Sequence, residues 1–197
     1  QAIEREGLLV SLDYLGERVS TRDAATAATK TYQELVGAVT AAGISRNLSL
    51  KLTQLGLDID RATAIDNLRR IVETASTADC FVRIDMESSA YTDETLDVFE
   101  TLWSLGCRNI GIVIQSYLRR SREYVERMNG LGARVRLVKG AYREPTEVAF
   151  QQKSEVDAAF VELMQILLMS GHYPAIATHD ETIIETTRRF AADMQIR

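Results

Sequence analysis

Charged and amide side chains stand at the ends of five apolar segments in this 197-residue sequence. They comprise an amine, carboxylates, an amide, a guanidinium and an imidazole, at Lys51, Asp85 with Glu87, Gln115, 136–142 and 178–180. Groups of this kind bind a charged substrate, orient a heterocycle through its polar edge and transfer protons. A single ionic residue at a strand end commonly belongs to a solvated rim, but five segments that share the feature indicate a polar binding site.

Lys51, Asp85 and Gln115 each admit a structural and a functional interpretation. Lys51 either holds Asp85 in an ion pair or takes part in the site, and Arg83 is a further structural partner for the same carboxylate. Gln115 either ends its strand or binds the edge of a flavin or nucleobase with its amide, which both donates and accepts. The structural interpretations are compatible with catalysis.

The segment 136–142 combines cations with a glycine at the end of a strand. Because Gly140 has no side chain, a ligand can approach the main chain there. Side chains alternate along a strand, so Arg136 and Lys139 project from opposite faces and only one of them faces the site. We expect this to be Arg136, with Lys139 contributing through its backbone.

His179 and Asp180 are candidates for a general base or for metal ligands. The other histidine of the sequence, His172, lies at the opposite end of the same predicted strand. Cys80 and Cys107 are too few for a disulfide framework and too far apart for a metal motif, and we expect them to be buried thiols. The sequence therefore predicts no metal site.

The elements that position these residues alternate between helix and strand. Four helical patterns end at a glycine that precedes an apolar strand, namely Gly43 before 48–53, Gly106 before 110–114, Gly132 before 134–139 and Gly171 before 174–178. Such a glycine supplies the left-handed residue that closes a helix. Helix starts are marked by Ser20 with Asp23, by Asp60 and by Thr92. With 8–12 and 80–86, the sequence predicts six strands alternating with six helices.

Repeated strand and helix units require parallel strands, in an open doubly wound sheet or in a closed barrel. Strands covered by helices on both faces are nearly unbroken apolar runs. In 48–53, 82–87 and 134–137, however, apolar residues alternate with polar or charged ones. One face is therefore apolar and the other ionic, which favours an α/β fold of the (β/α)8 TIM barrel type, whose interior opens onto a binding site.

A (β/α)8 barrel has eight such units and about 250 residues. The sequence holds six units and ends after its sixth predicted helix, which would leave strands one and six as unpaired edges. We therefore expect a single catalytic barrel domain over 1–197 that is truncated after six βα units.

Composition excludes several classes of protein. Lys plus Arg number 23 against 28 Asp plus Glu, so the net charge is −5 and offers no basic surface to nucleic acid. No apolar run approaches the roughly 20 residues of a membrane span, and no targeting pattern opens the sequence. We expect a cytoplasmic protein whose membrane contact, if any, is peripheral, at the inner face of the membrane.

Five segments, in order and at matching strand ends, resemble the signatures of the flavin-dependent proline dehydrogenases of the monofunctional bacterial type. They are 50–56 (LKLTQLG), 84–87 (IDME), 115–118 (QSYL), 136–142 (RLVKGAY) and 177–180 (ATHD), and 13–17 (DYLGE) fits as well. The resemblance covers essentially the whole chain, and RLVKGAY is its most specific part.

The resemblance implies oxidation of L-proline to Δ1-pyrroline-5-carboxylate, the first step of proline catabolism. A hydride would pass from the ring carbon beside nitrogen to N5 of FAD, and the electrons would then pass to a membrane quinone. It further implies that Arg136 lies near flavin N5 as a fixed cation, that Asp85 and Lys51 line the proline pocket, and that Tyr142 packs on the substrate. Asp85 and Arg136 are thus the catalytic candidates. The residues expected to bind FAD are Met86, Gln115, Lys139, Gly140, Ala141, Thr178 and His179.

The sequence departs from the family pattern in one respect: strand eight and the final helix are missing. In the family, an arginine pair on that helix holds the substrate carboxylate. We therefore expect these 197 residues alone to be inactive or very weak. Two other functions stay open on the residues alone. One is a Schiff-base lyase that uses Lys51 as nucleophile and Asp85 as proton shuttle. The other is an inactive scaffold fragment that binds neither flavin nor proline.

Overall fold

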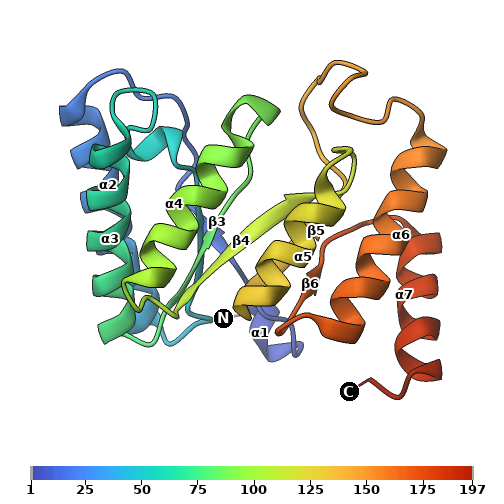
Figure 1. Cartoon of the computed structure of the whole chain (residues 1–197). Helices are drawn as coiled ribbons and strands as arrows, with labels where there is room; N and C mark the ends of the chain where they lie inside the picture. Colours follow the sequence, from blue (N-terminus) through green and yellow to red (C-terminus); the bar gives the residue numbers. More distant parts are fainter. Residues whose placement is uncertain (1, 197) are drawn as a thin grey trace. The chain divides into compact units, whose positions relative to one another are not determined.

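A computed structural model of the chain describes residues 2–196, in which helices and strands alternate as predicted (Figure 1). The chain forms two compact units, each described by itself below. Unit 1 comprises Gln1–Asp85 and Glu94–Gly111, and unit 2 comprises Met86–Asp93 and Ile112–Arg197.

Unit 1 contains the first three strands and the helices that follow them. Its elements are α1 (Ala2–Arg5), β1 (Leu12–Asp13), α2 (Arg22–Ala42), β2 (Asn47–Leu50), the 3-10 turn η1 (Thr53–Leu55), α3 (Arg61–Thr77), β3 (Phe81–Ile84) and most of α4 (Thr92–Ser104). Unit 2 contains the 3-10 turn η2 (Ser89–Tyr91), most of β4 (Ile110–Gln115), α5 (Ser121–Leu131), β5 (Arg134–Val138), α6 (Lys153–Ser170), β6 (Ala175–Ile176) and α7 (Glu181–Asp193).

The strands pair in parallel, β1 with β2, β2 with β3, and β5 with β6. Their hydrogen-bonded order follows the chain, β1-β2-β3-β4-β5-β6. A doubly wound sheet reverses its strand order at a switch point, and this order contains no reversal. The strand order therefore supports the barrel class over the doubly wound class.

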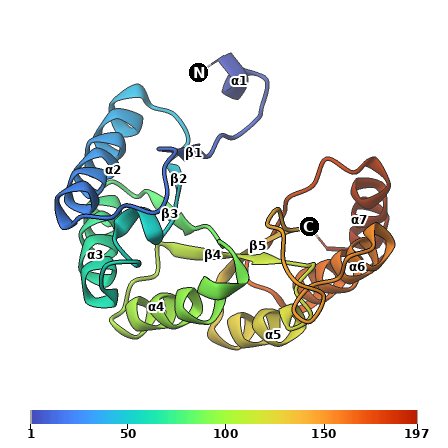
Figure 2. The same ribbon diagram turned by 90° about the horizontal axis from the view of Figure 1, so that it is seen from above.

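One face of the strands in unit 1 packs against helices, and it is apolar. The register places Leu48 beside Val82 and Leu50 beside Ile84, and all four side chains are fully buried. Figure 2 shows α2 and α3 along one side of β1, β2 and β3, and likewise α6 and α7 along one side of β5. Because side chains alternate across a strand, the polar residues between these four apolar residues lie on the other face.

The helix boundaries show why the sequence folds in this way locally. Asp60 caps α3 as predicted, since its carboxylate accepts the backbone N–H of Thr63 at 3.1 Å. Gly43, Gly106 and Gly132 have positive φ angles of 61°, 91° and 72°, as a glycine that closes a helix requires. Gly171 does not, because its φ is −80° and the chain continues from α6 in an extended conformation.

Several predicted boundaries are wrong. The strands predicted over 48–53 and 174–178 are present as Asn47–Leu50 and Ala175–Ile176. The strand predicted over 8–12 is present only as Leu12–Asp13, because β2 offers pairing partners at those two positions while Leu8 and Leu9 remain 56% and 83% exposed. The cap of α2 is Thr21 and not Ser20, since the Thr21 hydroxyl accepts the backbone N–H of Ala24 at 3.2 Å.

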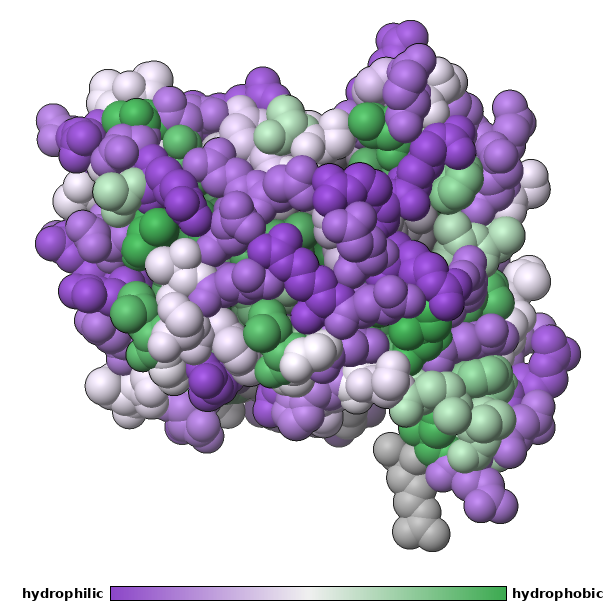
Figure 3. Space-filling model, in the orientation of Figure 1, coloured by the Kyte–Doolittle hydropathy of each residue, from purple (hydrophilic) through white to green (hydrophobic). Residues whose placement is uncertain are grey.

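The outward faces of α4 and α5 carry mostly hydrophilic side chains, as the surface coloured by hydropathy shows (Figure 3). On α5, Arg122 pairs with Glu126 at 3.0 Å, and on α6 Glu162 forms a second ion pair with Arg122. Among the helices of residues 2–196, none has the length and apolar character needed to cross a bilayer.

Replacing the capping residue of α2 tests the observed helix start. We expect Thr21→Ala to lower the free energy of unfolding by about 1 kcal/mol, because it leaves a backbone N–H of the first turn without its acceptor. Ser20→Ala is the matched control and should change stability by less than about 0.5 kcal/mol. Denaturant titration measures both, and equal effects of the two substitutions would contradict the assignment.

Candidate functional site

The polar face of unit 1 brings together residues from three strand ends. The register places Asp13 beside Ser49 and Ser49 beside Arg83, so these three side chains share one face. Lys51 and Asp85 directly follow β2 and β3, two residues after Ser49 and Arg83. The backbone N–H of Asp85 donates to Leu50 O at 2.8 Å, which continues the pairing of the two segments. By the alternation of the pleat, Lys51 and Asp85 therefore lie on this same polar face.

Lys51 forms an ion pair that sequence reasoning did not anticipate. Its Nζ lies 3.8 Å from Oδ2 of Asp13, and both side chains are about one fifth exposed. The structural interpretation of Lys51 had named Asp85 as its partner. Asp85 lies on the same face and takes part in other interactions. The signal that could have identified Asp13 was its place in the segment 13–17 at the end of the first strand.

Gln115 is held at the end of β4 by the neighbouring backbone. Ser116 N donates to Val138 O at 2.7 Å and Tyr117 N donates to Lys139 O at 2.9 Å, so the ends of β4 and β5 are joined. The Gln115 side chain is 2% exposed, and its Nε2 donates to Met86 O at 3.3 Å. Within residues 2–196 its Oε1 is buried and has no hydrogen-bond partner.

The buried Oε1 of Gln115 bears on whether Gln115 and Met86 fit a bound flavin. A buried acceptor without a donor costs free energy unless a bound molecule supplies the hydrogen. The edge of a flavin ring carries an N–H group, and Gln115 and the backbone of Met86 are the kind of groups that hold such an edge. The residues present therefore fit the group.

Arg136 and Lys139 project from opposite faces of β5, as the pleat predicts. In the burial pattern of β5, Val135 and Leu137 are buried and Arg136 is half-buried. Lys139 Nζ reaches the helices instead, at 2.6 Å from Asp157 Oδ1 on α6 and 2.9 Å from Asp180 Oδ2.

Lys139, Lys153, Asp157 and Asp180 form a cluster of alternating charge. Burial lowers the pKa of Lys139, but its hydrogen bonds to the two aspartates outweigh this and raise the pKa above its ordinary value. The hydrogen bonds from Lys139 and Lys153 hold the pKa of the Asp180 carboxyl well below its usual range. Asp180 also caps α7, so the cluster ties the end of β5 to the start of that helix.

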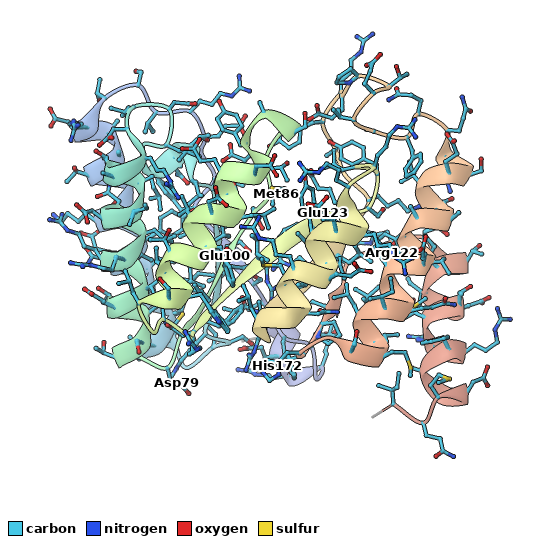
Figure 4. All side chains as sticks on the ribbon, viewed as in Figure 1. Asp79, Met86, Glu100, Arg122, Glu123 and His172 are labelled. Atoms are coloured by element: carbon cyan, nitrogen blue, oxygen red, sulfur yellow. The ribbon has the colours of Figure 1, made fainter. Side chains whose placement is uncertain are left out.

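The segment after β6 carries Thr178 and His179. Thr178 Oγ1 accepts the backbone N–H of Asp180 at 3.0 Å, which fixes the turn into α7. His179 and Ala141 are exposed, and Thr178 is half-buried. Figure 4 labels Met86, which follows β3, and His172, which precedes β6, and Met86 lies higher in this view than His172. Among residues 2–196, no three His, Cys, Asp or Glu side chains are grouped as a metal site requires.

Gly140 lies against the ring of Tyr117. A Cβ built on Gly140 would stand 2.4 Å from Cδ1 and Cε1 of Tyr117, and the φ of Gly140 is +116°. Close packing of this ring, which sequence reasoning did not anticipate, is a sufficient reason for glycine here. Burial and the nearby Glu144 carboxylate raise the pKa of Tyr117 to about 12.

Glu144 fastens the loop that carries Tyr142. Its carboxylate accepts from the backbone N–H of Ser89 at 2.7 Å and from the Ser89 hydroxyl. Tyr142 is half-buried two residues before this contact. The loop after β5 is therefore attached to η2, which follows Met86 along the chain.

Comparison with known proteins decides the family. The family model described as proline dehydrogenase matches residues 1–197. The chain belongs to the proline dehydrogenase family. Proline dehydrogenase 1 of Bacillus subtilis (strain 168) is 37% identical over 194 residues, which is 98% of this chain and 64% of that protein. Proline dehydrogenase of Deinococcus radiodurans is 38% identical over 194 residues, which is 96% of this chain and 63% of the relative.

Solved structures of related proteins agree with this assignment to the proline dehydrogenase family. A crystal structure of proline utilization A (PutA) from Bdellovibrio bacteriovorus, inactivated by N-propargylglycine, matches 100% of this chain and 25% of that chain, with a TM-score of 0.89 and 26% identity. The predicted α/β fold of the (β/α)8 type is thereby confirmed. The chain spans about 64% of the length of the Bacillus relative.

Substitution of Gly140 tests the packing at the end of β5. We expect Gly140→Ala to lower the free energy of unfolding by about 2–4 kcal/mol, since the added methyl group would overlap the Tyr117 ring and an L residue is strained at this φ. Gly130→Ala in α5 is the matched control, because a Cβ there meets nothing within 4 Å. The control should be neutral or raise stability by up to about 1 kcal/mol. A Gly140→Ala protein as stable as the control, measured by denaturant titration, would disprove this packing.

Proposed function

We propose that the protein to which this chain belongs is a flavin-dependent enzyme that oxidises L-proline to Δ1-pyrroline-5-carboxylate. The observation that carries the proposal is membership of the proline dehydrogenase family over residues 1–197. We assign these residues to the catalytic domain, FAD as the cofactor and a quinone as the electron acceptor, with peripheral contact at the inner face of the membrane. Family membership favours this function over the Schiff-base lyase and the inactive scaffold.

The residues of unit 1 suit the substrate. Proline carries a carboxylate and a secondary ammonium group, so it needs a cation and an anion on the same side of the binding pocket. Lys51 and Asp85 supply this pair from neighbouring strands on one polar face. In this proposal the Lys51 ammonium binds the substrate carboxylate and the Asp85 carboxylate faces the ring nitrogen. The contact of Tyr142 with the substrate stays a prediction from the family resemblance.

The residues of unit 2 suit the cofactor. Gln115 and Met86 would hold the ring edge through the amide and the backbone, and the backbone of Lys139, Gly140 and Ala141 would line the ring. Thr178 and His179 would hold the remainder of FAD. Since the side chain of Lys139 reaches Asp157 and Asp180, its contribution is limited to its backbone.

When bound, the flavin accepts a hydride from the proline carbon beside nitrogen. Arg136 would supply a fixed positive charge that stabilises the negative charge which develops as the cofactor is reduced. Its position on β5 suits this role, because the adjacent Val135 and Leu137 are fully buried and hold the strand in place.

Removal of the Arg136 charge tests the catalytic assignment. In the full-length protein we expect Arg136→Met to slow reduction of the flavin by L-proline about 10²–10³-fold, since a preorganised charge contributes on this scale. Arg134→Met is the matched control, because Arg134 lies on the same face two residues earlier and stacks on Tyr173. Stopped-flow absorbance measures both. An Arg136→Met protein that is reduced as fast as the control would contradict the assignment.

Removal of the Gln115 amide tests the cofactor assignment without reference to activity. We expect Gln115→Leu to weaken FAD binding about tenfold, which corresponds to the loss of about 1.4 kcal/mol of hydrogen bonding. Gln165→Leu on α6 is the control and should keep the wild-type ratio of flavin to protein after gel filtration. Equal flavin retention by both variants would remove Gln115 from the site.

A further inference from the structure

A buried tyrosine lies behind the polar face of unit 1. Tyr32 is on α2, and its side chain is fully buried. Its hydroxyl lies 3.0 Å from Asp13 Oδ1, 3.1 Å from Tyr14 O and 3.1 Å from Gln54 Oε1. No sequence signal set Tyr32 apart from the apolar residues of the helix.

All three of these neighbours are hydrogen-bond acceptors, whereas a phenol has one proton to donate. Gln54 Nε2 donates to Tyr14 O at 3.0 Å, which serves that carbonyl and fixes which end of the amide faces Tyr32. Of the acceptors that remain, the Asp13 carboxylate is charged, and hydrogen bonds to charged groups are the stronger ones. The Tyr32 proton is therefore directed to Asp13.

Asp13 connects Tyr32 to Lys51. Oδ1 of the carboxylate receives the tyrosine hydroxyl, and Oδ2 lies 3.8 Å from Lys51 Nζ. A carboxylate that is held at one oxygen presents the other in a fixed direction. Burial and the Asp13 carboxylate raise the pKa of Tyr32 far above its usual value, so the phenol stays protonated and remains a donor.

The surroundings of Tyr32 add rigidity to this arrangement. Its ring meets that of Tyr14 edge to face, with centroids 5.9 Å apart. Gln54 lies so close to Gly16 that a Cβ there would stand 2.4 Å from Gln54 Nε2. The loop between β1 and α2 is also attached to η1, because Arg18 N donates to Thr53 Oγ1 at 3.0 Å.

We infer that Tyr32 is a positioning residue for substrate binding, which orients Asp13 so that Asp13 in turn holds the Lys51 ammonium where it binds the carboxylate of proline. This inference rests on the proposed function. Tyr32 contacts neither substrate nor cofactor in this role and acts through Asp13. Its loss therefore weakens the binding of proline more than it slows the chemical step.

A double-mutant cycle in the full-length protein tests the inference. Tyr32→Phe raises KM for L-proline about tenfold, equivalent to about 1.4 kcal/mol, and changes kcat by less than about twofold. Asp13→Asn raises KM by at least the same factor. Because both act along one path, Tyr32→Phe/Asp13→Asn is no more than about twofold worse than Asp13→Asn alone.

Thr29→Val is the matched control on the same helix. Thr29 is 2% exposed and its hydroxyl donates to Ala25 O at 2.8 Å, so the substitution removes a buried hydroxyl from α2 without touching Asp13. The control keeps the wild-type KM. An unchanged KM in Tyr32→Phe, a KM in the control that rises as much as in Tyr32→Phe, or effects of Tyr32→Phe and Asp13→Asn that multiply would overturn the inference.

The wild-type protein separates this inference from the proposed function. If L-proline does not reduce the wild-type flavin, the proposed function is wrong and the role in proline binding falls with it. If the wild type is reduced and Tyr32→Phe behaves like wild type, only the inference is wrong. Thermal unfolding of the wild type, the two single variants and the double variant measures the coupling of Tyr32 and Asp13 without any substrate. Additive shifts in Tm would show that the two residues are not coupled.

Discussion

The alternation of side chains along parallel strands is the constraint on which the candidate site depends. In unit 1 it places Leu48, Leu50, Val82 and Ile84 on the face that packs against helices. The residues that alternate with them are forced onto the opposite face, where Asp13, Lys51 and Asp85 come from the ends of three successive strands. A shift of one residue in register would exchange the two faces, so burial of the leucines also fixes the position of the charges. Stability and site geometry therefore have the same physical origin in this unit.

The same constraint separates two neighbouring cations in unit 2. Arg136 and Lys139 are three residues apart in one basic segment, yet Lys139 reaches Asp157 on α6 and Asp180, which caps α7. A lysine in a signature segment thus stabilises the turn into α7 and leaves Arg136 as the cation on the opposite face. The tie between β5 and Asp180 also sets the position of Thr178 and His179, two residues that we propose to hold the cofactor.

Much of the fold could be predicted because it is encoded in local patterns. Glycines with positive φ close α2, α4 and α5, and the alternation in 48–53 and 134–137 identified the two faces of the strands. The first strand was predicted too long because no strand or helix of residues 2–196 covers its apolar residues Leu8 and Leu9, which are 56% and 83% exposed. An apolar segment forms a strand only where a neighbouring strand pairs with it, and the local sequence pattern does not show whether such a strand is present.

For the candidate site, the sequence indicated which residues take part but not which residues they contact. Position at a strand end drew attention to Lys51, Asp85 and Gln115, but their partners depend on contacts between distant residues. Asp13 is 38 residues before Lys51, and Tyr32 lies on a helix where it reads as one more core residue. Gly140 was interpreted as space for a ligand, and sequence reasoning missed that a Cβ there would also overlap the ring of Tyr117. The identity of substrate and cofactor came from family resemblance and not from spacing.

The most direct measurement is the visible absorption spectrum of the purified full-length protein before and after anaerobic addition of L-proline. The account predicts a bound flavin whose absorption band bleaches on addition of L-proline, with Δ1-pyrroline-5-carboxylate as the product. A colourless protein, or a flavin band that L-proline leaves unchanged, would contradict the account.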